Sequence, residues 1–162
     1  MSRRLADELG AILDACDVMR RADEQRQKQV ESEGLAFLAG FAELRAKVVR
    51  PVFEAAGEML KAHGHDFAIE EHEFVFEADG KTREAAISLR ITPAGMEAAA
   101  AADARLRELS FTTRHYNKTI SIANGAVPQS GSTATGGHVL SQIGAQLVED
   151  HLLKLAAALV RA

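Results

Sequence analysis

The feature that most constrains this chain is a stripe of apolar residues that recurs every three or four positions from residue 5 to residue 59. Thirteen of its sixteen positions are apolar, and their mean spacing is 3.6 residues. That is the period of a straight α-helix, not the 3.5 of a sustained left-handed coiled coil. Such a helix cannot bury its apolar face alone, so it needs a partner helix or a sheet. The positions are Leu5, Leu9, Ile12, Cys16, Met19, Asp23, Arg26, Val30, Gly34, Phe37, Phe41, Leu44, Val48, Val52, Ala55 and Met59.

A polar stretch over residues 20–34 interrupts this stripe and leaves two alternatives open. Asp23 and Arg26 occupy stripe positions there, so the stretch is either a solvated part of one helix or the approach to a hairpin turn near Ser32–Gly34. We favour one continuous helix because the periodicity is unbroken on both sides of the stretch.

A proline lies further along the stripe. Pro51 removes a helical hydrogen bond and crowds the carbonyl four residues earlier, but the stripe stays in phase across it. The sequence therefore predicts a kink near Pro51. It also predicts a helix end near His63–Gly64, where glycine can adopt a left-handed conformation.

After Gly64 the period changes to the alternation of β-strands. Phe67 and Ile69 alternate with Asp66 and Ala68, and Phe74 and Phe76 follow with the opposite parity. This change of parity predicts a bulge or a break within residues 70–73. Asp79-Gly80 predicts a hairpin turn, and residues 84–92 predict the returning strand, with Ala85, Ile87, Leu89 and Ile91 facing the core.

The last part of the chain predicts a second hairpin followed by a helix. Its strands are residues 106–116 and 119–124, joined at Asn117-Lys118. The alanine-dense residues 96–104 before them are either a short helix after Thr92-Pro93 or a connection, and a helix is expected over about 138–160. The predicted fold is α+β: a long N-terminal helix (residues 1–64), a four-stranded antiparallel sheet of two hairpins and a C-terminal helix packed on that sheet (residues 65–162), as one compact domain with a helical extension.

Composition narrows the class of protein. The formal net charge of −4 argues against a general binder of nucleic acid or anionic membranes, and no apolar run is long enough to span a bilayer. A single cysteine excludes an intramolecular disulfide, so we expect a cytoplasmic location. Because Cys16 lies in the apolar stripe, we expect it to be a buried structural thiol. Nothing in the sequence calls for a cofactor.

A loop and a histidine cluster are the two candidate sites. Residues 130–137 precede the expected last helix, where backbone N–H groups and the helix dipole favour anions, although the loop lacks the lysine of a phosphate-binding loop. Its candidate ligand-binding residues are Ser132, Thr133, Thr135, Gly136 and Gly137, and the alternative is a plain connector. The second candidate is a metal site of His63, His65 and His72 with nearby carboxylates; its alternative is a helix end followed by a solvated acidic strand.

His151 lies within the apolar stripe of the last helix, so we expect it at the core boundary, hydrogen-bonded to a backbone group. No spacing of nucleophile, base and acid stands out, and an enzymatic role is not favoured.

The leading hypothesis is a non-enzymatic cytoplasmic interaction or scaffold module that forms a homo-oligomer, with a dimer favoured, through Leu5, Leu9, Ile12, Cys16 and Met19. The alternative is a domain that binds a small, anionic ligand at residues 130–137. A metal-dependent enzyme is a third possibility.

Overall fold

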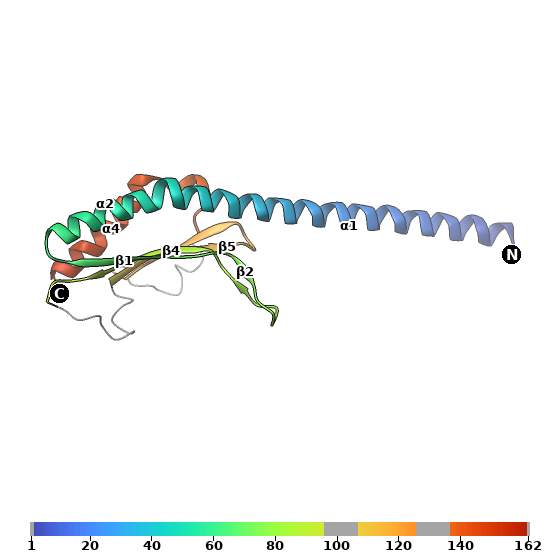
Figure 1. The fold of residues 1–162 in the computed structure, drawn as a ribbon. Helices are drawn as coiled ribbons and strands as arrows, with labels where there is room; N and C mark the ends of the chain where they lie inside the picture. The colour runs from blue at the N-terminus through green and yellow to red at the C-terminus, as the bar shows by residue number, and fades with distance from the viewer. Residues whose placement is uncertain (1, 96–106, 126–136, 162) are drawn as a thin grey trace. The chain divides into compact units, whose positions relative to one another are not determined.

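The computed structural model describes residues 2–95, 107–125 and 137–161 (Figure 1). Two compact units make up the chain, Met1–Ala36 and Phe37–Ala162. The boundary between them falls inside the first helix. The predicted division into a long helix (residues 1–64) and an antiparallel sheet with a C-terminal helix (residues 65–162), as one compact domain with a helical extension, stays a prediction.

The long N-terminal helix is present. Helix α1 comprises Arg3–Leu44, the π-helical segment η1 comprises Arg45–Val49 and helix α2 comprises Arg50–Ala62. Residues 32–34 are helical within α1, so the alternative of a hairpin turn at this place is not adopted.

The π-helical segment lies immediately before Pro51. The Arg50 N–H donates to the carbonyl of Arg45, five residues earlier, and proline stands in the first turn of α2. Because the pyrrolidine ring cannot donate and crowds the preceding turn, the wider π-turn accommodates it without ending the helix. The backbone hydrogen bonding of the helix is therefore altered where the kink is expected, and the kink itself stays a prediction.

Helix α2 ends at His63–Gly64, the position that the sequence predicted. His63 is the C-cap residue and Gly64 has a φ of +85°. The Gly64 N–H donates to the Lys61 carbonyl at 3.0 Å, and the His65 N–H donates to the Leu60 carbonyl at 3.0 Å. This pair of bonds is a Schellman motif, which turns the chain into the first strand.

Four of the described strands form an antiparallel sheet in the order β1-β4-β5-β6. The strands are β1 (Asp66–His72), β4 (Ala86–Thr92), β5 (Glu108–Arg114) and β6 (Thr119–Asn124). The two predicted hairpins lie side by side, since β4 also pairs with β5 and places Ile87 opposite Phe111. Lys118, at the predicted turn of the second hairpin, has a φ of +56°.

The predicted change of parity after β1 is a break rather than a bulge. Strands β2 (Val75–Phe76) and β3 (Thr82–Arg83) form a separate two-stranded sheet. At its tip Gly80 has a φ of +82°, and the Lys81 N–H donates to the Asp79 carboxylate at 3.1 Å. The connection spans residues 77–81, longer than the two-residue turn suggested by Asp79-Gly80.

Helices α2 and α4 (Ala145–Arg161) lie on the same face of the main sheet (Figure 1). The core between these layers consists of large side chains from each element. They are Phe37, Phe41, Val49, Phe53, Ile87, Leu89, Ile91, Leu109, Phe111, Ile120, Ile143, Val148, Leu152 and Leu155. The predicted α+β fold, with its inward-facing Ala85, Ile87, Leu89 and Ile91, is confirmed.

The start of the last helix was predicted wrongly. We expected a helix from about residue 138, but α4 begins at Ala145 and is preceded by the short 3₁₀ helix η4 (Leu140–Gln142). His138 instead forms a β-bridge with Ile120, and Ile143 has an extended backbone. Pairing of His138 with Ile120 places the start of this segment at the edge of the sheet and overrides its apolar helical spacing. The expected helix or connection at residues 96–104 lies outside the described residues.

Candidate functional site

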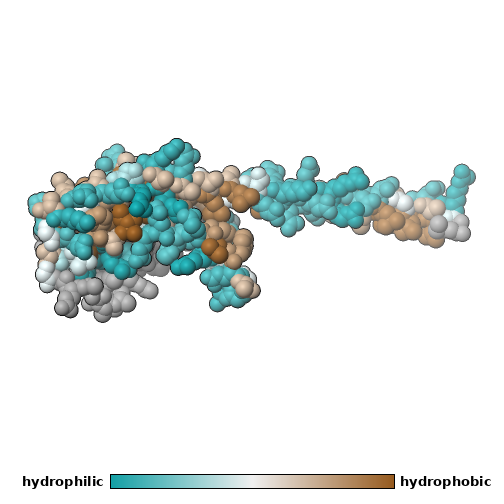
Figure 2. Space-filling model, in the orientation of Figure 1, coloured by the Kyte–Doolittle hydropathy of each residue, from teal (hydrophilic) through white to brown (hydrophobic). Residues whose placement is uncertain are grey.

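The first unit carries an exposed apolar face on α1. No residue of 2–36 is buried, and the buried residues of α1 are Phe37 and Phe41 in the second unit. Figure 2 shows the apolar side chains gathered in the N-terminal part of α1, followed by a hydrophilic stretch. The exposed fractions of those on the stripe range from 43% to 67%, and the residues are Leu5, Leu9, Ile12 and Met19. Leu13 beside the stripe and Val18 off the stripe are also exposed.

Cys16 lies on this same face and is exposed. The expected burial of Cys16 is not seen in this single chain, because no element within the described residues of the first unit covers the apolar stripe over residues 5–19.

Little within the first unit stabilises its helix. The ion pairs Arg4–Glu8 and Arg20–Asp17 are each 3.2 Å long and join exposed side chains. Exposed pairs of this kind contribute about 0.3–0.5 kcal/mol. Most helical stability in proteins comes from packing of an apolar face, and within the described residues of the first unit the apolar face of α1 is not packed.

The three histidines of the predicted metal site have different surroundings. His63 caps α2, and the Nδ1 atom of His65 accepts a hydrogen bond from the Ala94 N–H at 2.9 Å. His72 ends β1. Among residues 2–95, 107–125 and 137–161, no three His, Cys, Asp or Glu side chains come together as a possible metal site.

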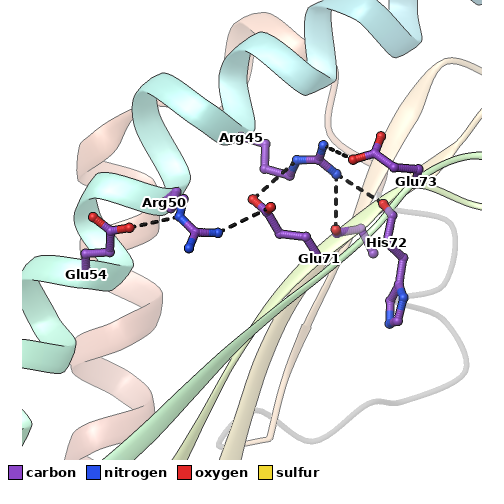
Figure 3. A network of polar contacts seen from close by, with 7 residues as sticks. Arg45, Arg50, Glu54, Glu71, His72 and Glu73 are labelled. Carbon is purple, nitrogen blue, oxygen red and sulfur yellow. Dashed lines mark hydrogen bonds and ion pairs between the residues drawn. The ribbon is translucent and has the colours of Figure 1, made fainter.

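The carboxylates near these histidines are held by two arginines instead (Figure 3). Arg45 of η1 forms ion pairs with Glu71 (3.5 Å) and Glu73, and its Nη1 donates to the His72 carbonyl at 3.1 Å. Arg50 bridges Glu71 (3.2 Å) and Glu54 (2.8 Å). Hydrogen bonds from Arg50 to Glu54 and Glu71 raise the pKa of the Arg50 guanidinium above its ordinary value.

This network joins the π-helical segment to the end of β1. The Arg45 side chain is only 9% exposed, whereas that of Arg50 is 42% exposed. A buried guanidinium needs paired acceptors, and Arg45 finds them in carboxylates and in the β1 carbonyl. The acidic run at residues 70–73 was visible in the sequence, but nothing there indicated that arginines of the long helix would meet it.

The glycine-rich loop gains no support as an anion site. Ser132, Thr133, Thr135 and Gly136 lie outside the described residues, and Gly137 is separated from the start of α4 at Ala145. The helix whose dipole motivated this site therefore does not begin directly after the loop in the sequence. Packing explains the glycine at position 137, because a Cβ atom there would lie 2.5 Å from the Thr119 hydroxyl oxygen.

Sequence reasoning missed a pair of titratable side chains, Glu84 and His115. The Glu84 carboxylate accepts hydrogen bonds from the Thr113 hydroxyl (2.9 Å) and the His115 backbone N–H (3.3 Å), and it also contacts the His115 Nδ1 atom. The imidazole ring packs on Phe74, with ring centroids 4.9 Å apart. Thr113 is fully buried, so this cluster joins the end of β5 to the segment before β4.

His151 lies at the core boundary, as expected, but its ring lies near the side chain of Asn124 rather than the expected backbone group. The Asn124 side-chain amide donates to the His151 carbonyl at 2.9 Å and lies 3.3 Å from its Nδ1 atom. Burial lowers the pKa of His151, and the nearby Lys154 and His138 lower it further, against the opposing effect of Asp150. The His138 Nδ1 atom is itself buried with no hydrogen-bond partner in the described part of the chain.

A groove of about 850 Å³ lies between α2 and α4. Most of its lining is apolar, and Ile91 of β4 belongs to it as well. The lining residues are Pro51, Val52, Ala55, Ala56, Met59, Leu60, His63, His65, Ile91, Glu149, Leu152, Leu153 and Ala156.

No family model, no curated protein and no solved structure matches this chain. No helix in the described residues has both the length and the apolar character needed to cross a membrane.

Proposed function

We propose that this protein is a non-enzymatic interaction module that assembles as a homodimer through residues 5–19 of α1. The observation that carries the proposal is the exposed apolar face of the first unit, where no residue of 2–36 is buried. Contiguous exposed apolar surface of this kind is typical of protein interfaces.

The size of the apolar face supports association. Full burial of one large apolar side chain contributes about 1.5–3 kcal/mol, and the cost of association is about 4–15 kcal/mol. The five residues Leu5, Leu9, Ile12, Cys16 and Met19 on each of two chains can therefore offset that cost. A second copy is the simplest partner because a twofold interface uses the same face twice.

The polar clusters of the second unit support a structural rather than a catalytic role. Arg45 and Arg50 join η1 and α2 to β1, and the Glu84–His115 pair joins β5 to the segment before β4. The proposal includes a cytoplasmic setting, in keeping with the single cysteine of the sequence.

Matched variants test the assembly. Light scattering and sedimentation equilibrium of the wild-type protein are expected to give twice the chain mass of 17.4 kDa. Ile12→Glu places a charge on the interface face and is expected to give the monomer mass. Val18→Glu is the control, because Val18 is equally exposed but lies off the stripe, and it is expected to remain dimeric. A wild-type monomer at micromolar concentration would rule out the proposal.

The alternative function, binding of a small anionic ligand by residues 130–137, stays a prediction because those residues other than Gly137 lie outside the described part of the chain. The metal-dependent enzyme has no assembled ligand set to support it among the described residues.

A further inference from the structure

The spacing of the apolar stripe is more regular over residues 5–30 than over the whole of residues 5–59. Between Leu5 and Val30 the steps alternate regularly between four and three residues, which is a seven-residue repeat. The mean of 3.6 over residues 5–59 arises from later positions, where a step of four follows another step of four. A seven-residue repeat keeps its stripe in contact with a neighbouring helix in a left-handed coiled coil.

We propose that residues 5–30 pair with the same segment of a second copy as a parallel, in-register, two-stranded coiled coil. This inference rests on the proposed homodimer and specifies its geometry. It concerns a segment that is helical throughout, since α1 comprises Arg3–Leu44.

A parallel register places every stripe residue opposite its own copy. In heptad notation the a positions are Leu9, Cys16, Asp23 and Val30, and the d positions are Leu5, Ile12, Met19 and Arg26. The five layers from Leu5 to Met19 are then all apolar and consecutive. Cys16 of one chain meets Cys16 of the other in the middle of this run.

Charge complementarity favours the same register. Asp23 and Arg26 are the two charged residues of the stripe between residues 5 and 30, and they have opposite signs. A residue at position a inserts among four residues of the facing helix, one of which is the d residue three positions later. Each Asp23 therefore meets the partner's Arg26, and the twofold axis forms this ion pair twice. Neither side chain has an ion pair among the described residues of its own chain.

An antiparallel register can give either the run of apolar layers or the ion pair between Asp23 and Arg26, but not both. An antiparallel register that packs the Leu5–Met19 segments of the two chains against each other places Asp23 opposite Leu5 of the partner, or opposite a position before Leu5. The register that pairs Asp23 with the partner's Arg26 places Ile12 opposite Phe37, which is buried in the second unit. Two strands also suit the charged residues best, because the long Arg26 side chain can reach water at the edge of a two-stranded seam.

Cysteine cross-linking in the full-length protein tests the register. In wild-type protein, mild oxidation is expected to link Cys16 to the partner's Cys16, because a disulfide requires Cα atoms less than about 7 Å apart. In a Cys16→Ala background, Leu9→Cys and Met19→Cys are each expected to link to themselves. Asp14→Cys, on the opposite face of the same helical turn, is the control that is expected not to link.

The outcomes separate this inference from the proposed function. A dimer mass without self-linking at positions 9 and 19, or with linking between Leu9→Cys and Met19→Cys chains in a mixture, overturns the parallel register and leaves the homodimer standing. A mass of three or more chains overturns the two-stranded form. A monomer mass overturns both proposals.

A charge-reversal cycle tests the register through its ion pairs. Asp23→Arg or Arg26→Asp alone is expected to raise the dimer dissociation constant about tenfold or more, and the double variant is expected to restore it to within about threefold of wild type. Additive losses in the double variant would show that these residues do not meet and would overturn the proposed register.

Discussion

Gly57 of α2 lies so close to the ring of Phe67 in β1 that a Cβ atom on residue 57 would be 2.3 Å from the Phe67 Cζ atom. The aromatic ring occupies the space of the missing side chain, which lets α2 approach the sheet. The Lys61 ammonium lies 5.2 Å from the centroid of the same ring.

Gly57→Ala is expected to destabilise the protein by about 1–3 kcal/mol, because overpacking at this contact outweighs the better helix propensity of alanine. Gly10→Ala is the matched control: no atom lies within 4 Å of a Cβ atom there, so about 0.5–1 kcal/mol of stabilisation is expected. Urea unfolding followed by circular dichroism measures both. A Gly57→Ala variant as stable as wild type would contradict this close packing.

Replacing Arg45 is expected to cost more than replacing Arg50. Arg45→Ala removes a buried guanidinium from Glu71, Glu73 and the His72 carbonyl, for an expected loss of about 3–5 kcal/mol. Arg50→Ala removes a more exposed partner and is expected to cost about 1 kcal/mol or less. Equal losses in the free energy of unfolding would refute the anchoring role of Arg45.

The packing of α4 is tested by two neighbouring leucines. Leu155 is fully buried and Leu153 is 68% exposed. Leu155→Asp is expected to lower the free energy of unfolding by more than about 4 kcal/mol, since it buries an unpaired charge. Leu153→Asp is expected to change stability by about 0.5 kcal/mol or less. Similar melting temperatures for the two variants would argue against this orientation of α4.

Stability is expected to depend on the protonation of His151. Burial lowers the pKa of this imidazole in the folded protein, while the unfolded chain keeps the ordinary value of about 6.5. The unfolded state therefore binds more protons, and stability falls as the pH drops below about 6.5.

Denaturant unfolding of wild type and His151→Gln from about pH 8 to about pH 5 measures this effect. The variant is expected to lose less stability over that range than wild type, because glutamine does not titrate and the Asn124 bond to the backbone carbonyl of residue 151 remains. Identical pH dependence would show that His151 does not contribute.

The second unit is expected to fold without the first. Deletion of residues 2–30 removes no buried side chain, since none of residues 2–36 is buried. The shortened chain is expected to show a cooperative thermal transition and a monomer mass. An unfolded product would indicate that the first unit is needed for the core.

Much of the fold followed from local patterns. The end of α2 was predictable because a left-handed residue is needed there and Gly64 supplies it at little steric cost. The inward face of β4 was predictable because strand side chains alternate, so Ile87, Leu89 and Ile91 point the same way. These features depend on a few neighbouring residues.

The candidate sites were less predictable because they depend on contacts between distant segments. Glu71 and Glu73 of the expected metal site pair with Arg45 and Arg50, and His115 meets Glu84. The observed start of α4 differs from the predicted start because His138 pairs with Ile120, a contact that local residue spacing does not predict.

The sequence by itself determined the long helix, the strands and the heptad spacing of Leu5–Val30, since periodicity and turn chemistry act over a few residues. Only the tertiary structure decided which polar groups meet and which apolar faces the chain covers. Burial depends on the packing of segments far apart in the sequence, and that packing covers Phe37 and Phe41 while the stripe from Leu5 to Met19 stays exposed.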